Sequence, residues 1–255
     1  MQRRLLLNGA GAVSMFSVFG CGQTPVSRGS GGCCVAAHSL KSLIDGRNPR
    51  YGSISIDDPM IGFSGDREFD RALGRQLVRL AATFRVNPAF AYVDDRLDRN
   101  AIASPSTRVR GTWGTVLFGI NFMRSMLSGA TGGDIAVLGV CAHEFAHIFQ
   151  FRTGYFDRLQ AIHYTSKPYE LHADFLAGYF VGLTKVMRPS ISLDAFHDSF
   201  YRMGTYDARD PDFHGTPAER TQAITQGIRS ATSGLSLDGV AQRAFSFSTS
   251  SAILG

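Results

Sequence analysis

The hydrophobic positions of the chain change their spacing several times, and each change predicts a different element. From Asp66, apolar residues recur at every third or fourth position until Pro88, which predicts one amphipathic helix. Short apolar runs at 89–93, 100–103 and 112–120 predict three strands, because turn-forming and polar residues separate them. We therefore expect a small sheet that follows one helix.

Longer apolar stretches in the second half of the chain predict three more helices. Each is opened by a glycine, a proline or a polar residue that suits a helix N-terminus. They run from the turn at 131–134 to about Arg152, from about Pro168 to about Met187, and from about Pro217 to about Ser230. The Ser- and Gly-rich segment 231–255 has no assignable pattern, and we treat it as a C-terminal tail of unknown structure.

The first residues of the chain have the composition of an export signal. A short basic start and an apolar stretch too short to span a bilayer comfortably predict a signal peptide at 1–20, with an uncleaved anchor helix as the alternative. The sequence VFGC at 18–21 resembles a bacterial lipoprotein cleavage site, which predicts a lipid on Cys21. The paired arginines near the start also resemble a twin-arginine signal, so the export route stays open.

Export and lipidation predict where the protein resides. Residues 21–40 contain a Gly- and Ser-rich stretch that suits a lipidated tether. We therefore expect an exported protein of the cell envelope or periplasm, held at the membrane as a lipoprotein.

Composition and charge limit the classes of function. The chain has 255 residues, of which 44% are hydrophobic and 18% charged, as in soluble globular proteins. Its formal net charge of +5 is too small to indicate a nucleic-acid partner. The four cysteines show neither zinc-ligand spacing nor a disulfide framework, and the state of Cys33 and Cys34 stays open. One catalytic domain is expected at 41–230.

The segment HEFAH at 143–147 carries the most specific chemistry in the sequence. On a helix, His143 and His147 are about 40° apart, so both imidazoles can reach one ion while Glu144 stays beside it. The surrounding residues are apolar, and buried histidines need partners that a metal would supply. We predict one Zn²⁺ per chain, with Glu144 as the general base toward a zinc-activated water. A helix that merely carries histidines is the alternative.

A second helix offers a third ligand. Glu170 and Asp174 lie one turn apart in an apolar context, where two carboxylates repel unless a cation or an imidazole N–H lies nearby. We predict Glu170 as the third zinc ligand and Asp174 as the acceptor that orients a ligand histidine. The alternative is a solvent-facing acidic pair. His172 points away from Glu170 and is not expected to bind the metal.

Together, HEFAH and ELHADFLAG resemble the gluzincin metallopeptidases, in particular the compact M48-like and neutral zinc metallopeptidase families. Weaker likenesses at 100–103, 119–123 and 214–220 extend the resemblance over residues 66–230. It implies an α+β fold: a compact, minigluzincin-like zincin domain with a small β-sheet and an HExxH active-site helix. It also implies a zinc-dependent endopeptidase acting on peptide or protein substrates.

The segment HGTPAER at 214–220 adds two candidates to this resemblance. His214 is a candidate for stabilising the oxyanion or closing the cleft, and Arg220 for tying the segment to a carboxylate such as Asp174. Tyr206 and His163 are other candidate oxyanion donors. Ordinary capping and surface pairing are the alternative for His214 and Arg220.

Two other functions compete with an exported peptidase. A catalytically silent, zinc-stabilised lipoprotein could act as an assembly or chaperone-like module, but a purely structural site needs no Glu144. A membrane-embedded peptidase is disfavoured because no apolar stretch after the leader reaches transmembrane length. A peptide substrate could pair with a sheet edge formed by 100–103 or by 112–120.

Overall fold

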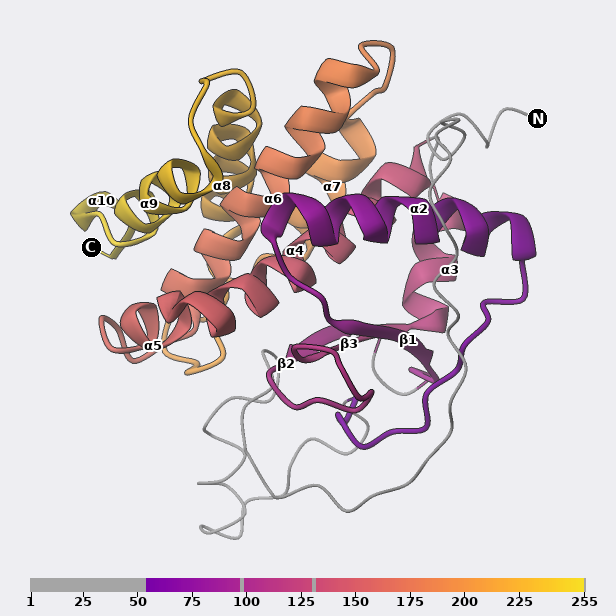
Figure 1. The fold of residues 1–255 in the computed structure, drawn as a ribbon. Helices are drawn as coiled ribbons and strands as arrows, with labels where there is room; N and C mark the ends of the chain where they lie inside the picture. Colours follow the sequence, from indigo (N-terminus) through magenta and orange to yellow (C-terminus); the bar gives the residue numbers. More distant parts are fainter. Residues whose placement is uncertain (1–53, 97–98, 130–131, 255) are drawn as a thin grey trace, which may run out of the picture.

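The computed structural model describes residues 54–96, 99–129 and 132–254. Within them, helices lie over one face of a small sheet, and the last helices pack on the far side of that helical layer (Figure 1). The α+β class predicted from the sequence is confirmed. The predicted leader, Cys21 and the tether at 21–40 lie outside the described residues.

The first helix and the sheet follow the predicted pattern closely. Helix α2 begins after Asp66, whose carboxylate accepts hydrogen bonds from the amides of Glu68 and Phe69. The elements are α2 (Arg67–Phe84), β1 (Ala89–Val93), β2 (Ala101–Ser104) and β3 (Thr115–Gly119). The strand order is β1-β3-β2, with β1 parallel and β2 antiparallel to β3. Since β3 is central, the segment 112–120 cannot offer a sheet edge to a peptide, whereas β2 lies at an edge.

Both faces of the sheet are buried. One face presents Val116 and Phe118 to the main core beneath the helices. The other presents Leu117 and Ile102 to a smaller apolar cluster that Ile54 completes. This two-sided burial explains why the strands read as continuous apolar runs instead of alternating ones.

The predicted strand at 112–120 is too long at both ends: β3 begins only at Thr115, and Ile120 opens a helix, α3 (Ile120–Gly129). The carboxylate of Asp95, which is buried, accepts hydrogen bonds from the amides of Asn121 and Phe122 at 2.7 and 2.8 Å. This side chain, distant in the sequence, satisfies the free amides at the start of α3. The apolar run alone gave no sign of that cap.

The remaining elements form the helical body. The three predicted helices are present as α4, α6 and α8, and four shorter helices accompany them. The bounds are α4 (Gly133–Thr153), α5 (Tyr155–Gln160), α6 (Lys167–Met187), α7 (Asp194–Arg202), α8 (Pro217–Ser230), α9 (Leu237–Ser248) and α10 (Ser251–Leu254). Helix α4 is buried around nearly its whole circumference, which makes it the centre of the core.

The segment after residue 230, which the sequence left unassigned, belongs to the same folded body. Val240, Ala241 and Ala244 on α9 are buried in the main core, and α9 packs against α6. The ammonium of Lys167, at the start of α6, donates to the carbonyl oxygen of Ile253 in α10. The folded region therefore continues to the end of the described chain.

Helices α6 and α8 make the most extensive helix pair, and two glycines allow it. A Cβ on Gly178 would collide with the backbone of Ile224, and one on Gly227 would collide with the carbonyl oxygen of Phe175. The backbones thus approach more closely than any larger residue would permit. This contact brings residues of α8 within reach of the face of α6 that carries Glu170 and Asp174.

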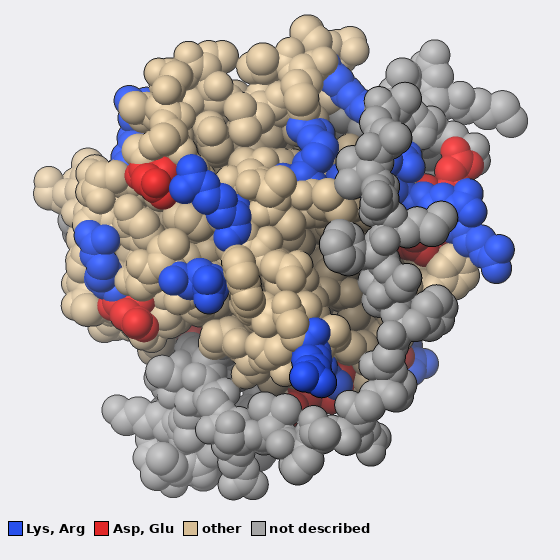
Figure 2. Space-filling view, in the orientation of Figure 1, with Lys and Arg blue, Asp and Glu red and all other residues tan. Residues whose placement is uncertain are grey.

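None of the helices in the described part of the chain combines the length and apolar character that a membrane span requires. On the face drawn in Figure 2, the Lys and Arg side chains occupy separate positions, several of them beside acidic groups.

Candidate metal centre

Helices α4 and α6 bring three candidate ligands together in the core. His143 and His147 project from α4, and Glu170 projects from the first turn of α6. All three side chains are buried, and their ligand atoms lie within 4.8 Å of one another. The structure therefore contains a His/His/Glu group that could hold one metal ion.

The spacing of these atoms suits a small dication. The two Nε2 atoms of His143 and His147 are 2.9 Å apart, and Glu170 Oε2 and Oε1 lie 3.2 and 3.6 Å from them, respectively. Ligands at about 2.0–2.1 Å in a tetrahedron are about 3.3 Å apart. Two imidazoles and one carboxylate, with a fourth position left open, are a donor set that zinc takes in catalytic sites. The residues present fit zinc.

A buried ion pair holds the first ligand histidine. Asp174 Oδ1 lies 2.8 Å from His143 Nδ1, and Arg220 on α8 donates two hydrogen bonds of 2.8 Å to the two carboxylate oxygens of Asp174. Arg220 also donates to the carbonyl oxygen of Met203 at 3.4 Å. The expected contact between Arg220 and Asp174 is thus present, and the solvent-facing alternative for the acidic pair is excluded because both carboxylates are buried.

Glu144 is buried beside the triad and remains incompletely satisfied. Its Oε2 has no hydrogen-bond partner among the described residues. Such an orphaned buried acceptor costs about 1–3 kcal/mol. Burial raises the pKa of Glu144 to about 7, although the positive charge of His143 opposes the rise. A carboxylate poised near neutral pH and short of a donor suits a group that accepts a proton from water.

The three candidate ligands differ in the direction in which their surroundings shift their pKa values. Burial lowers the pKa of His143, but the carboxylates of Asp174 and Glu170 outweigh burial and raise it to about 10. Burial lowers the pKa of His147 to about 3, which keeps this imidazole neutral. Burial would raise the pKa of Glu170, yet the neighbouring His214 and His147 hold it well below its ordinary value. The cationic His143 thereby balances the buried carboxylates.

His214 lies at the rim of this group. Its Nδ1 is 3.6 Å from Glu170 Oε2, and its side chain is 25% exposed. The other two candidate donors have different surroundings: His163 Nδ1 pairs with the hydroxyl of Thr165 at 2.8 Å, and Tyr206 is 76% exposed. Of the three candidates, His214 is the one placed against a ligand of the triad.

Sequence reasoning missed Gln150, which is fully buried on α4 one turn after His147. Its Oε1 lies 2.8 Å from His147 Nδ1. The one available signal was a polar residue inside the apolar run HIFQF, at helical spacing from a ligand histidine.

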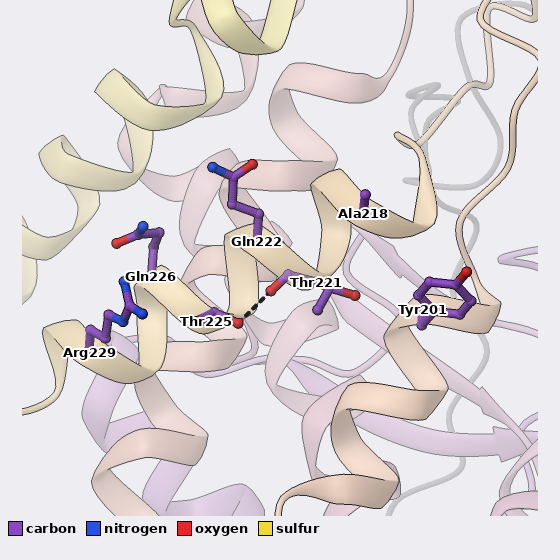
Figure 3. A pocket seen from close by; sticks show the side chains of 7 residues that line it. All are labelled: Tyr201, Ala218, Thr221, Gln222, Thr225, Gln226 and Arg229. Atoms are coloured by element: carbon purple, nitrogen blue, oxygen red, sulfur yellow. Dashed lines mark hydrogen bonds between the residues drawn. The ribbon is translucent and has the colours of Figure 1, made fainter.

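A surface pocket of about 420 Å³ lies on another face of α8. Figure 3 shows its lining, in which Tyr201 comes from α7 and the other side chains come from α8. The hydroxyl of Thr225 donates to the carbonyl oxygen of Thr221 at 2.7 Å, so it is satisfied within its own helix. Buried side chains on the opposite side of α8, such as Ile224, face α6 instead. This pocket contains none of the triad.

Comparisons of the chain with models of known protein families, with curated proteins and with solved structures found no match. The geometry of the site suggests a metal-dependent hydrolase: a His/His/Glu group that could bind a metal lies beside Glu144, whose Oε2 has no hydrogen-bond partner among the described residues.

Proposed function

We propose that the protein is a zinc-dependent endopeptidase of the gluzincin type. The observation that carries the proposal is Glu144 Oε2, buried beside the triad without a hydrogen-bond partner in the described part of the chain. When bound, zinc would supply a Lewis acid that polarises the scissile carbonyl and makes a water molecule more acidic. His143, His147 and Glu170 would hold it.

The other side chains have roles that follow from their contacts. Glu144 takes a proton from water at Oε2 and delivers it to the departing amine. Asp174, fixed by Arg220, keeps the imidazole of His143 oriented. His214, at the rim, donates a hydrogen bond to the oxygen that becomes negative. The edge strand β2, which packs against α4, offers main-chain groups to an extended peptide.

The alternative function, a catalytically silent, zinc-stabilised lipoprotein, accounts for fewer features of the site than a peptidase does. A purely structural zinc usually has four protein ligands, and such a site gains nothing from a buried carboxylate that lacks a donor. The orphaned Glu144 therefore favours catalysis over scaffolding.

The test compares the full chain with its Glu144→Gln variant on an unbiased peptide library. Both should bind one zinc, and the variant should lose about 10²–10⁴-fold in cleavage rate because the proton acceptor is gone. Glu68→Gln, the same change at an exposed position on α2, serves as the matched control and should retain full activity. Equal cleavage by the wild type and Glu144→Gln, or no cleavage by either when zinc is bound, would overturn the proposal.

We also propose that the protein is exported to a bacterial cell envelope and held at the membrane by a lipid on Cys21. The support is the leader at 1–20 and the cysteine that follows it.

A further inference from the structure

A chain of buried hydrogen bonds runs from the ligand histidine His147 to helix α9. His147 Nδ1 lies 2.8 Å from Gln150 Oε1, and Gln150 Nε2 lies 2.7 Å from the carbonyl oxygen of Tyr169 and 3.0 Å from His172 Nδ1. His172 Nε2 in turn lies 3.2 Å from the carbonyl oxygen of Ala241. The side chains of His147, Gln150 and His172 are fully buried. The network thus has no water-exposed member among its side chains.

The backbone carbonyl oxygens of Tyr169 and Ala241 determine which side-chain nitrogens of this hydrogen-bond network carry protons. The carbonyl oxygen of Tyr169 can only accept, so the Gln150 atom facing it is the amide NH₂. Gln150 Oε1 therefore faces His147, and because it can only accept, His147 Nδ1 carries the proton. The Nε2 of the neutral His147 ring is left with its lone pair free.

The same reasoning fixes the opposite tautomer on His172. The carbonyl oxygen of Ala241 accepts from His172 Nε2, so that nitrogen carries the proton. His172 Nδ1 then accepts the second N–H of the Gln150 amide. Each donor and acceptor of Gln150 has a partner, so the amide cannot rotate without breaking buried hydrogen bonds.

We propose that Gln150 is a positioning residue for the metal centre: anchored by Tyr169 and His172, it holds His147 in the tautomer whose Nε2 lone pair faces the metal. The inference rests on the proposed metal site. In this tautomer the unprotonated nitrogen is His147 Nε2, which lies 2.9 Å from His143 Nε2 and 3.6 Å from Glu170 Oε1.

The choice of an amide at this position has a chemical reason. The other ligand histidine, His143, is oriented by the carboxylate of Asp174, whose charge Arg220 balances. The hydrogen-bond partners of Gln150 among the described residues are all neutral: His147, the carbonyl oxygen of Tyr169 and His172. A carboxylate there would lack donors toward Tyr169 and would add uncompensated buried charge. A glutamine gives the same acceptor without that cost.

The first measurement assigns histidine tautomers by long-range ¹H–¹⁵N NMR in the metal-free full chain labelled with ¹⁵N-histidine. His147 should be the Nδ1–H tautomer, and His172 should be the Nε2–H tautomer. A purely structural role for Gln150 makes no such demand on both rings. The Nε2–H tautomer at His147 in the wild type would overturn the proposal, and this result requires no variant to fold.

The second measurement compares zinc affinity in Gln150→Met with that in Gln76→Met, by competition with a chelator. Gln76 is also a buried glutamine, on α2, where its Oε1 accepts from Arg79 at 2.7 Å. Loss of a hydrogen bond to a ligand histidine should weaken zinc binding about 10–100-fold. Gln76→Met should leave the affinity within about twofold of the wild type.

The outcomes separate this inference from the proposed function. Unchanged zinc affinity in Gln150→Met would overturn the positioning role while leaving the peptidase proposal intact. Undiminished cleavage by Glu144→Gln would overturn the general base while leaving Gln150 as a positioning residue. A wild type that binds no zinc would overturn both.

Discussion

At the scale of single residues, the site is organised by buried charges that neutralise one another. Burial raises the pKa of Asp174, but the Arg220 guanidinium and the hydrogen-bonding His143 outweigh burial and lower it. A carboxylate with a depressed folded-state pKa stabilises the fold above its unfolded pKa of about 3.9, and this contribution is lost as the pH falls through the folded value. Arg220 offsets the free-energy cost of burying the charged carboxylate of Asp174.

The variant Arg220→Met should therefore lower the free energy of unfolding by about 3–5 kcal/mol at pH 7, because it leaves Asp174 buried without its cation. The deficit should shrink as the pH falls below about 4, because the stabilisation that Arg220 gives Asp174 is lost as the pH passes through the lowered pKa of that carboxyl. Urea unfolding of the metal-free protein at several pH values measures both effects.

The double variant Arg220→Met with Asp174→Asn is the control for this ion pair. It should be less destabilised than the sum of the two single variants, because it carries no unpaired charge. Strict additivity of the two changes would show that the pair is not coupled.

At the scale of elements, close helix packing sets the position of the ion pair. Helix α8 carries Arg220 toward α6 only because Gly178 and Gly227 let the two backbones meet. The capping box of α8 adds rigidity, since Thr216 accepts from the amide of Glu219 and the Glu219 carboxylate accepts from the amide of Thr216. The helix start and the helix contact together fix where Arg220 lies.

Gly227→Ala should destabilise the fold by about 1–3 kcal/mol, since the added Cβ would force α8 away from Phe175 on α6. It should also weaken zinc binding, because Arg220 moves with α8. Thermal unfolding and chelator competition check the two effects.

The matched control is Gly74→Ala on α2, where an added Cβ meets no atom within 4 Å. It should raise stability by about 0.5–1 kcal/mol through helix propensity and leave zinc affinity unchanged. Equal effects of the two substitutions would contradict the packing argument.

The long helices and the pairing of the two histidines could be predicted from the sequence. Helices α2, α4, α6 and α8 were predicted because their apolar positions extend over many turns. The pairing of His143 with His147 follows from helical spacing alone. Both predictions needed only local information.

The missed features depend on contacts between distant parts of the chain. Helix α3 is capped by Asp95, and α7 buries little more than Phe196 and Phe200, so neither leaves a long apolar pattern. The contacts of Gln150 reach Tyr169 and, through His172, Ala241. No spacing rule along one helix could have indicated them.

At the scale of the whole molecule, one hydrophobic core both stabilises the fold and surrounds the candidate metal site. The triad lies in the same apolar core that α9 completes near the C-terminus, while Cys21 lies far upstream of the first described residue. The folded domain and the proposed anchor are therefore separate in the sequence, and one can be altered without the other.

Cys21→Ser should move the protein from the membrane fraction to the soluble envelope fraction without changing zinc content, because the variant lacks only the proposed lipid attachment site. Cell fractionation followed by immunoblotting measures the distribution. Cys34→Ser, a cysteine in the same region but away from the cleavage site, should remain with the membrane. Membrane retention of Cys21→Ser would refute lipid anchoring at this residue.

The contacts that orient the two histidines also bear on when the candidate site is complete during folding. A nascent chain that has emerged only as far as α6 carries all three ligand side chains, but lacks Arg220 on α8 and the Ala241 carbonyl on α9. Its Asp174 would lack the guanidinium of Arg220, and His172 would lack the acceptor that fixes its tautomer. On the proposed metal site, tight zinc binding should therefore follow the docking of α8 and α9, so that an occupied site would report that both helices are in place.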